Sequence, residues 1–187
     1  MARSSARTEQ RILDAAYGLF WRQGFVRVSM DQIAERAKVT KRTLYQRFRS
    51  KDDLIAAALA HSSELAMQRL EQFKLPANRD AMIDSIFGQI ADWAATPRWS
   101  GAGFTRVAVE LADLRGHPAR AIARRHKAAV EAWFCARLAT AKVSSPRERA
   151  REIVLLMEGA MMLMLIHGDH GYAEAAAHAA KRLVRKN

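Results

Sequence analysis

Residues 39–48 read VTKRTLYQRF, and this stretch decides the fold of the chain. Leu44 and Phe48 are four residues apart, which places both side chains on one side of a helix. Thr40 stands at the expected N-cap, because its hydroxyl can accept a hydrogen bond from a backbone N–H of the first turn. The stretch therefore predicts a short helix with an apolar inner side and a basic outer side.

A second short helix is predicted immediately before this one. Ser29 and Gln32 have the spacing of a capping box, in which each side chain satisfies a backbone N–H at the helix start. Ala34 and Ala37 are small enough for two helices to cross closely. Only residues 38–40 separate the two helices, and this spacing is typical of a helix-turn-helix.

The outer side of the helix capped by Thr40 carries the chemistry of this motif. A recognition helix places its amino-terminal end in the major groove, where Arg and Lys pair with guanine and Gln pairs with adenine. The helix amino terminus also attracts phosphate. The side chains left outward are Lys41, Arg42, Thr43, Tyr45, Gln46 and Arg47.

Residues 33–54, IAERAKVTKRTLYQRFRSKDDL, resemble the DNA-binding segment of the TetR family of bacterial transcription regulators. That family typically has the pattern I-A-x-x-A-G-V-S-x-x-T-L-Y-x-x-F-x-S-K-x-x-L. Residues 12–25, ILDAAYGLFWRQGF, resemble its first helix. Lys38 departs from the pattern, because glycine usually occupies that turn position, and a non-glycine residue with positive φ is disfavoured by roughly 1 kcal/mol. Either the turn geometry differs slightly here, or the extra charge at the DNA surface compensates.

The resemblance implies a role for each outward residue. Lys41, Arg42 and Gln46 would face base edges, and Ser29 would lie near the DNA backbone at the amino end of its helix. The residues implied to contact phosphates, or to support those that do, are Thr40, Tyr45, Arg47 and Lys51. The alternative is that Tyr45 is only a half-buried aromatic side chain and Arg47 a solvated charge.

The net charge of +12 is concentrated near the amino terminus. Residues 1–51 hold 12 Lys and Arg against four Asp and Glu, a net of +8, whereas the remaining residues hold 19 against 15, a net of +4. Such a distribution favours nucleic acid or another anionic surface as the partner. Solubility alone is the competing explanation.

Helical periodicity continues to the carboxyl end, so the fold is predicted to be all-α with about nine helices. It would consist of an amino-terminal three-helix domain with the helix-turn-helix and a carboxy-terminal helical bundle. Ser145 and Glu148 predict a capping box for a helix that is apolar nearly all round between residues 153 and 166.

The resemblance implies a DNA-binding domain at residues 1–50 and an effector-binding and dimerisation domain at residues 51–187. The implied function is a sequence-specific transcription regulator, a repressor released by a small apolar ligand. The implied partners are a palindromic operator in double-stranded DNA and a second copy of the chain, paired through the last two helices. The competing hypothesis is a non-specific nucleic-acid-binding or architectural protein that senses no ligand.

Aromatic and methionine side chains supply the candidates for the ligand site, because such residues form adaptable apolar cavities. The six candidate ligand-binding residues are Trp93, Trp99, Phe104, Trp133, Met157 and Met161. Each is also explained by plain core packing. Weaker polar candidates are Arg106, Glu110, His117 and His126.

No motif for catalysis is present: the sequence lacks G-x-S-x-G, a phosphate loop and H-E-x-x-H. Residues 167–170, HGDH, are interpreted as a turn at a helix end rather than a metal site. We expect no enzyme activity and no cofactor. The single cysteine, the absence of a signal-like apolar core near the amino terminus and the short apolar run at 153–166 favour a cytoplasmic protein outside the membrane.

Overall fold

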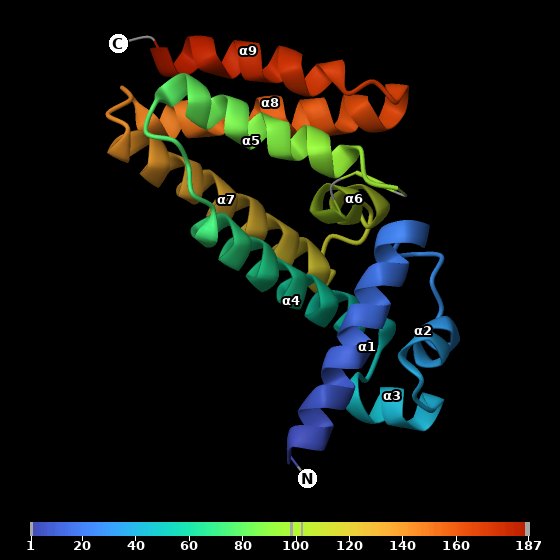
Figure 1. The fold of residues 1–187 in the computed structure, drawn as a ribbon. Helices are drawn as coiled ribbons and strands as arrows, with labels where there is room; N and C mark the ends of the chain where they lie inside the picture. Colours follow the sequence, from blue (N-terminus) through green and yellow to red (C-terminus); the bar gives the residue numbers. More distant parts are fainter. Residues whose placement is uncertain (1, 98, 102, 186–187) are drawn as a thin grey trace. The chain divides into compact units, whose positions relative to one another are not determined.

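The computed structural model describes residues 2–97, 99–101 and 103–185, with side chains from residue 5 onward. These residues form helices and no strand, which confirms the predicted all-α class (Figure 1). The helices are α1 (Ala2–Gln23), α2 (Met30–Ala37), α3 (Lys41–Arg47), α4 (Lys51–Gln72), α5 (Arg79–Ala94), α6 (Gly103–Glu110), α7 (Pro118–Thr140), α8 (Pro146–His167) and α9 (Gly171–Arg185).

Most helix boundaries follow the local signals of the sequence, with three differences. Helical periodicity predicts that the first helix starts near Thr8, but α1 begins at Ala2. It also extends the sixth helix to about Leu114, but α6 ends four residues earlier, at Glu110. The capping box predicted at Ser145 is wrong. Ser145 adopts a left-handed backbone with φ of 50°, and its side chain makes no capping hydrogen bond, so α8 starts on Pro146 without that support.

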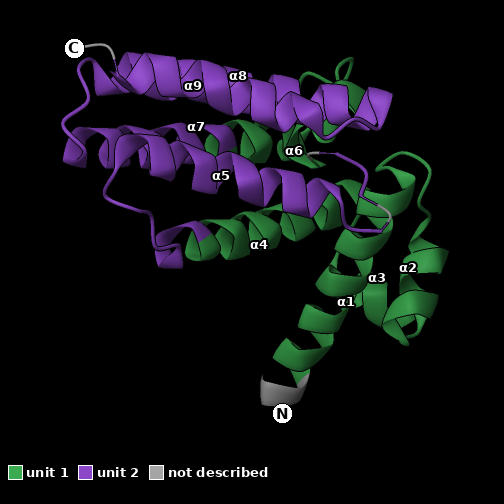
Figure 2. Ribbon diagram, turned by 45° about the horizontal axis from the view of Figure 1, so that its top comes forward, with its two compact units in different colours: residues 1–69, 103–126 green, residues 70–102, 127–187 purple. Residues whose placement is uncertain are grey.

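The helices fall into two compact units (Figure 2). The first contains residues 1–69 and 103–126, that is α1–α3, most of α4, α6 and the start of α7. Its core includes Ile12, Phe20 and Ile33, all 0% exposed. The division between residues 50 and 51 expected from the sequence is a functional one, and it stays a prediction.

The second unit contains residues 70–102 and 127–187, with α5, the rest of α7, α8 and α9. Helix α9 packs against both α5 and α8. Arg79 at the start of α5 fixes two helix ends, because its guanidinium donates to the carbonyl oxygens of Ala141, Lys142 and Val184 at 3.0, 2.5 and 3.1 Å. Such oxygens have no partner within their own helix, so one side chain satisfies groups at the ends of α7 and α9.

Candidate nucleic-acid interface

Helix α2 is fixed at its start by the predicted capping box. The Ser29 hydroxyl accepts from Gln32 N at 3.2 Å, and the Gln32 side chain accepts from Ser29 N at 2.8 Å. Ile33, Ala34 and Ala37 turn inward and are buried. Ser29 itself is exposed, but its hydroxyl is already engaged as an acceptor, so it could offer only its proton to a phosphate.

Lys38 takes the strained left-handed conformation that glycine would adopt without cost, so the turn geometry does not differ. Its backbone has φ of 53° and ψ of 48°, which is the left-handed region. The next amide, Val39 N, donates back to Ala34 O at 3.0 Å and closes the end of α2. The turn therefore keeps the geometry of a helix-turn-helix at the cost of a non-glycine residue with positive φ.

Helix α3 is anchored on one side only. Thr40 is its N-cap, with its hydroxyl accepting from Thr43 N at 3.1 Å, as predicted. Leu44 is fully buried and Phe48 is 7% exposed, and both belong to the core of the first unit, with Val39 packed against it. The opposite side of α3 is left to solvent, which is the arrangement that a recognition helix requires.

The outward residues of α3 differ in how they are engaged. Arg42 and Gln46 are exposed and have no hydrogen bond or ion pair with the described residues, and Tyr45 is 44% exposed. Lys41 pairs with Asp31 at 2.8 Å, and hydrogen bonding to that carboxylate raises the pKa of Lys41. Arg47 lies 4.0 Å from Glu9, at the limit of an ion pair.

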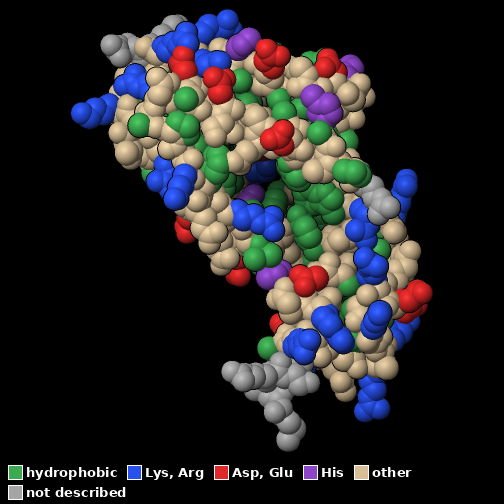
Figure 3. Space-filling view, viewed as in Figure 1, with side chains coloured by type: hydrophobic (Ala, Val, Ile, Leu, Met, Phe, Trp, Pro, Cys, Tyr) green, Lys and Arg blue, Asp and Glu red, His purple; other side chains and the backbone are tan. Residues whose placement is uncertain are grey.

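Lys51 is placed differently from the other predicted DNA contacts. Its ammonium donates to the Val26 carbonyl oxygen at 2.7 Å, and burial lowers its pKa. The side chain is therefore partly withdrawn and bonded within the protein. Figure 3 shows Lys and Arg side chains spread over the face that α1–α3 present in that view, which matches the excess of 12 Lys and Arg over four Asp and Glu in residues 1–51.

Comparison with known proteins agrees with this geometry. Residues 12–58 match the family described as bacterial regulatory proteins, tetR family. Over 64 residues the chain is 42% identical to the uncharacterized HTH-type transcriptional regulator TtgW of Pseudomonas putida, a match that covers 32% of this chain and 48% of that relative. The matched part thus spans about half the length of that curated relative.

The likeness extends beyond the helix-turn-helix in solved structures. A putative TetR transcriptional regulator from Streptomyces avermitilis is 29% identical, with a TM-score of 0.76 over 92% of this chain and 97% of that chain. The amino-terminal part of the chain, residues 12–58, therefore belongs to the TetR family. A structure of the multidrug binding protein EbrR complexed with ethidium shares the TetR fold at 24% identity and a TM-score of 0.73, covering 96% of this chain and 99% of that chain.

The residues predicted to bind the ligand of a TetR-family protein do not all fall in one unit. Met161, Met157 and Trp99 meet in one apolar cluster of the second unit. The rings of Trp93 and Trp99 lie 6.0 Å apart, and Trp133 packs edge-on against Phe134. Phe104 lies in the core of the first unit, where its ring stacks on His126 at 3.7 Å.

Two of these tryptophans bury a polar atom without a partner. The indole nitrogens of Trp99 and Trp133 have no hydrogen-bond acceptor among the described residues. Arg137 lies over the Trp133 ring at 5.4 Å but offers no acceptor. A buried donor without an acceptor costs about 1–3 kcal/mol, so both positions stand out from ordinary core.

The weaker polar candidates are bonded to other groups within the first unit. His117 Nδ1 accepts from Ala119 N at 3.1 Å at the start of α7, and its Nε2 lies 3.3 Å from Asp52. His126 Nδ1 lies 2.9 Å from the Ser63 hydroxyl. Glu110 accepts from Phe25 N, a contact that sequence reasoning missed because it joins residues far apart in the chain.

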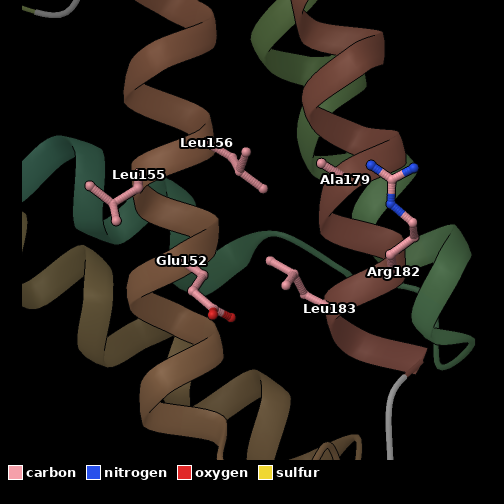
Figure 4. A pocket seen from close by; sticks show the side chains of 6 residues that line it. All are labelled: Glu152, Leu155, Leu156, Ala179, Arg182 and Leu183. Atoms are coloured by element: carbon pink, nitrogen blue, oxygen red, sulfur yellow. The ribbon is translucent and has the colours of Figure 1, made fainter.

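A groove between α8 and α9 was also missed as a site. It has a volume of about 530 Å³ and is lined by Glu152, Leu155, Leu156, Ala179, Arg182 and Leu183. Figure 4 shows Leu156 and Leu183 projecting into the space between the two helices. None of the six predicted ligand residues lines it. The signal was available, because these residues lie on the helices that the sequence assigned to dimerisation.

The described ranges of the chain hold neither a helix fit to span a membrane nor a cluster of metal-ligating side chains. No helix there is long and apolar enough to cross a membrane. No group of three or more His, Cys, Asp and Glu side chains there is placed to hold a metal ion. Residues 167–170 form a helix-end turn, with Gly168 in the left-handed region and Asp169 accepting from Gly171 N at 2.8 Å.

Proposed function

We propose that this protein is a sequence-specific DNA-binding transcription regulator that acts as a homodimer. The observation that carries the proposal is the outer side of α3, where Arg42 and Gln46 are exposed and unbonded to the described residues, on a helix held down by Leu44. Arg can form two hydrogen bonds to guanine and Gln two to adenine in the major groove. Tyr45, Arg47 and the capped amino end of α3 would contact phosphates beside them.

The proposed dimer rests on an apolar face of the second unit. Leu155, Met162 and Ile166 are 67%, 41% and 63% exposed, and their spacing places them on one side of α8. Gly159 lies between them, and a Cβ there would meet no atom of the described residues within 4 Å other than its chain neighbours and the nearby backbone of α8. We define the α8–α9 face as these residues together with the groove residues Ala179 and Leu183.

A second copy of the chain is the occupant that this face fits. An exposed apolar surface of this extent is unusual in a monomer. A two-fold axis would pack α8 and α9 of both copies into a four-helix bundle, with Gly159 allowing close approach of the helices. Glu152 and Arg182 at the groove provide opposite charges, which suits a surface that must be complementary to itself.

The proposed effector is a small aromatic molecule with a hydrogen-bond acceptor, and it would release the protein from DNA. The indole N–H groups of Trp99 and Trp133, unpaired within the described residues, support the acceptor. The ethidium complex of EbrR supports an aromatic ligand. The ligand would favour a dimer whose two α3 helices are wrongly spaced for successive major grooves. We propose that the DNA-bound form represses transcription until the ligand releases it.

Selection of binding sites from random DNA tests the regulator directly. We expect a palindromic site with two half-sites about one helical turn apart, and light scattering coupled to size exclusion should return a dimer. A non-specific or architectural protein would share the steep salt dependence but would bind the selected and random duplexes equally well. Equal affinity for both duplexes would therefore reject the proposal.

Two small molecules of matched shape test the proposed effector. 2-Acetylnaphthalene and 2-ethylnaphthalene have similar shapes, but only the first has a carbonyl acceptor. Quenching of tryptophan fluorescence should show tighter binding of the ketone, and Trp133→Phe should remove that preference. Equal binding of both probes, or binding of neither, would contradict an acceptor-bearing ligand.

A further inference from the structure

The turn between α1 and α2 is held by side chains from two other helices. Gly24 N still donates to Phe20 O at 2.9 Å, which ends α1. The next two amides leave the helix: Phe25 N and Val26 N donate to the same Glu110 carboxylate oxygen at 2.7 and 3.1 Å. Because backbone polar groups need partners, Glu110 of α6 does for this turn what a local capping residue would normally do.

The Glu110 carboxylate is itself fixed in place. Arg106, one turn earlier on α6, forms an ion pair with its other oxygen. The same guanidinium donates from Nη1 to the Trp21 carbonyl oxygen at 3.1 Å, so it bonds to the last turn of α1 as well. The Arg106 and Glu110 side chains are only 30% and 20% exposed, and hydrogen bonds to a charged acceptor are stronger than neutral ones.

Two glycines show how closely α6 packs against the end of α1. A Cβ on Gly24, which has φ of 94°, would lie 2.8 Å from Arg106 Nη2 and 2.8 Å from Glu110 Oε1. A Cβ on Gly103 would overlap the Trp21 ring. The Val26 carbonyl oxygen completes the turn by accepting from Lys51 Nζ at 2.7 Å. The backbone of residues 25–26 is thus bonded to both α6 and α4.

We propose that Glu110, braced by Arg106, is a positioning residue for the helix-turn-helix. Residues 25–26 lie four to five positions before Met30, where α2 begins, so the turn sets where α2 and α3 start. Glu110 lies on a helix more than 50 residues beyond the end of α3, and its role is to hold that turn rather than to touch DNA. The inference rests on the proposed function, because it concerns the orientation of the same DNA-binding surface.

Charge and position predict opposite effects of removing Glu110. A carboxylate in a DNA-binding protein repels phosphate, so its loss should strengthen binding to any duplex if electrostatics alone acted. A loss of positioning should instead weaken binding to the operator and leave binding to random DNA nearly unchanged. The direction of the change in affinity therefore separates the two explanations.

The experiment compares Glu110→Gln with Glu64→Gln in the full-length protein. Glu64 lies in the same unit, is exposed and has no hydrogen bond or ion pair with the described residues, so its variant makes the same charge change without touching the turn. The probes are the palindromic duplex selected by the wild-type protein and a random duplex of equal length, measured by fluorescence anisotropy. We expect Glu110→Gln to bind the palindrome about tenfold more weakly, while Glu64→Gln matches the wild type. Unchanged or tighter binding by Glu110→Gln would overturn the proposal.

A second readout does not depend on DNA. Amide hydrogen exchange at Phe25 and Val26 should become faster in Glu110→Gln and stay unchanged in Glu64→Gln, because only the first variant weakens their acceptor. If Glu110→Gln fails to fold, Arg106→Met removes the brace but keeps the carboxylate, and it should give a smaller loss of the same kind. If the wild type selects no site, the proposed function fails, whereas unchanged exchange at these amides rejects the positioning role alone.

Discussion

Helices α3 and α8 both expose one side to solvent, but the chemistry of the two exposed sides is opposite. On α3 the outward side chains are polar, and Arg42 and Gln46 have no partner in the described part of the chain. On α8 they are apolar, with Leu155 and Ile166 67% and 63% exposed. Hydrogen-bond donors without partners suit phosphates and base edges, whereas exposed leucine and isoleucine suit another protein surface.

The two surfaces also differ in how far their positions depend on contacts with other parts of the molecule. The α8–α9 face is made by two long helices that pack directly on each other. Helix α3 has only seven residues, and the turn before α2 is bonded to Glu110 and Lys51, which lie outside the helix-turn-helix. We therefore expect changes on α8 to act on assembly, and changes around α3 to act on DNA binding without altering the dimer.

The largest effect is expected for Leu155→Glu. Because Leu155 is 67% exposed, the change should leave the protomer folded, but pairing two copies would then bury an unpaired carboxylate twice. The dimer should weaken by at least about 100-fold, and operator binding should be lost with it. Analytical ultracentrifugation measures the change. Val109→Glu, also 67% exposed but on α6, is the matched control and should remain dimeric.

Arg42→Ala should give the next largest effect. Loss of a bidentate contact to guanine should cost about 1–3 kcal/mol on the best operator and relax the preference at one base position. The measurement is competitive binding against operators with each base changed in turn. Arg49→Ala removes the same charge from an exposed position just after α3, so it should weaken all sequences alike. A uniform loss in Arg42→Ala as well would refute base reading by this residue.

The salt dependence of DNA binding should distinguish Arg47, a proposed phosphate contact, from Lys51, which is bonded within the protein. Arg47→Ala removes a proposed phosphate contact and should reduce the salt slope by about one. Lys51 is bonded to the Val26 carbonyl oxygen, so Lys51→Met should weaken operator binding with an almost unchanged slope. Titration of binding against salt decides between them. If the salt slope of Lys51→Met fell by about one, the result would instead support the phosphate contact that the family resemblance implies for Lys51.

The smallest effect is expected at the two lysines with positive φ. Lys38 and Lys142 have φ of 53° and 55°, and glycine should relieve each by less than about 1 kcal/mol, because its greater freedom in the unfolded chain offsets part of the gain. Thermal unfolding should show a similar rise for Lys38→Gly and Lys142→Gly. DNA binding should weaken only for Lys38→Gly, which loses a charge beside α3.

The helix-turn-helix could be predicted because its determinants are local. The capping box of Ser29 with Gln32 and the N-cap at Thr40 depend only on residues within a few positions. Local reasoning also explains the inward placement of Leu44, since helical spacing fixes which side it shares. The outward residues could be named for the same reason, although their roles on DNA stay predictions.

The remaining features depend on contacts that spacing does not reveal. Ser145 has the sequence of a capping box, yet its left-handed backbone prevents the capping bond. Glu110 looked like a weak ligand candidate, because nothing near it in sequence indicates a bond to Phe25 N, 85 residues away. Lys51 looked like a phosphate contact, because its bond to Val26 O spans 25 residues.

The first unit is made of two separate stretches of the sequence, and this limits where a chimera with a related protein could be joined. A chimera joined at residue 50 would carry the helix-turn-helix without Lys51, Arg106 and Glu110, whose side chains complete the turn before α2. A transplant that also included residues 51–69 and 103–126 would keep those partners together. The proposed DNA specificity would therefore transfer together with part of the helical segment that follows, and not with residues 1–50 alone.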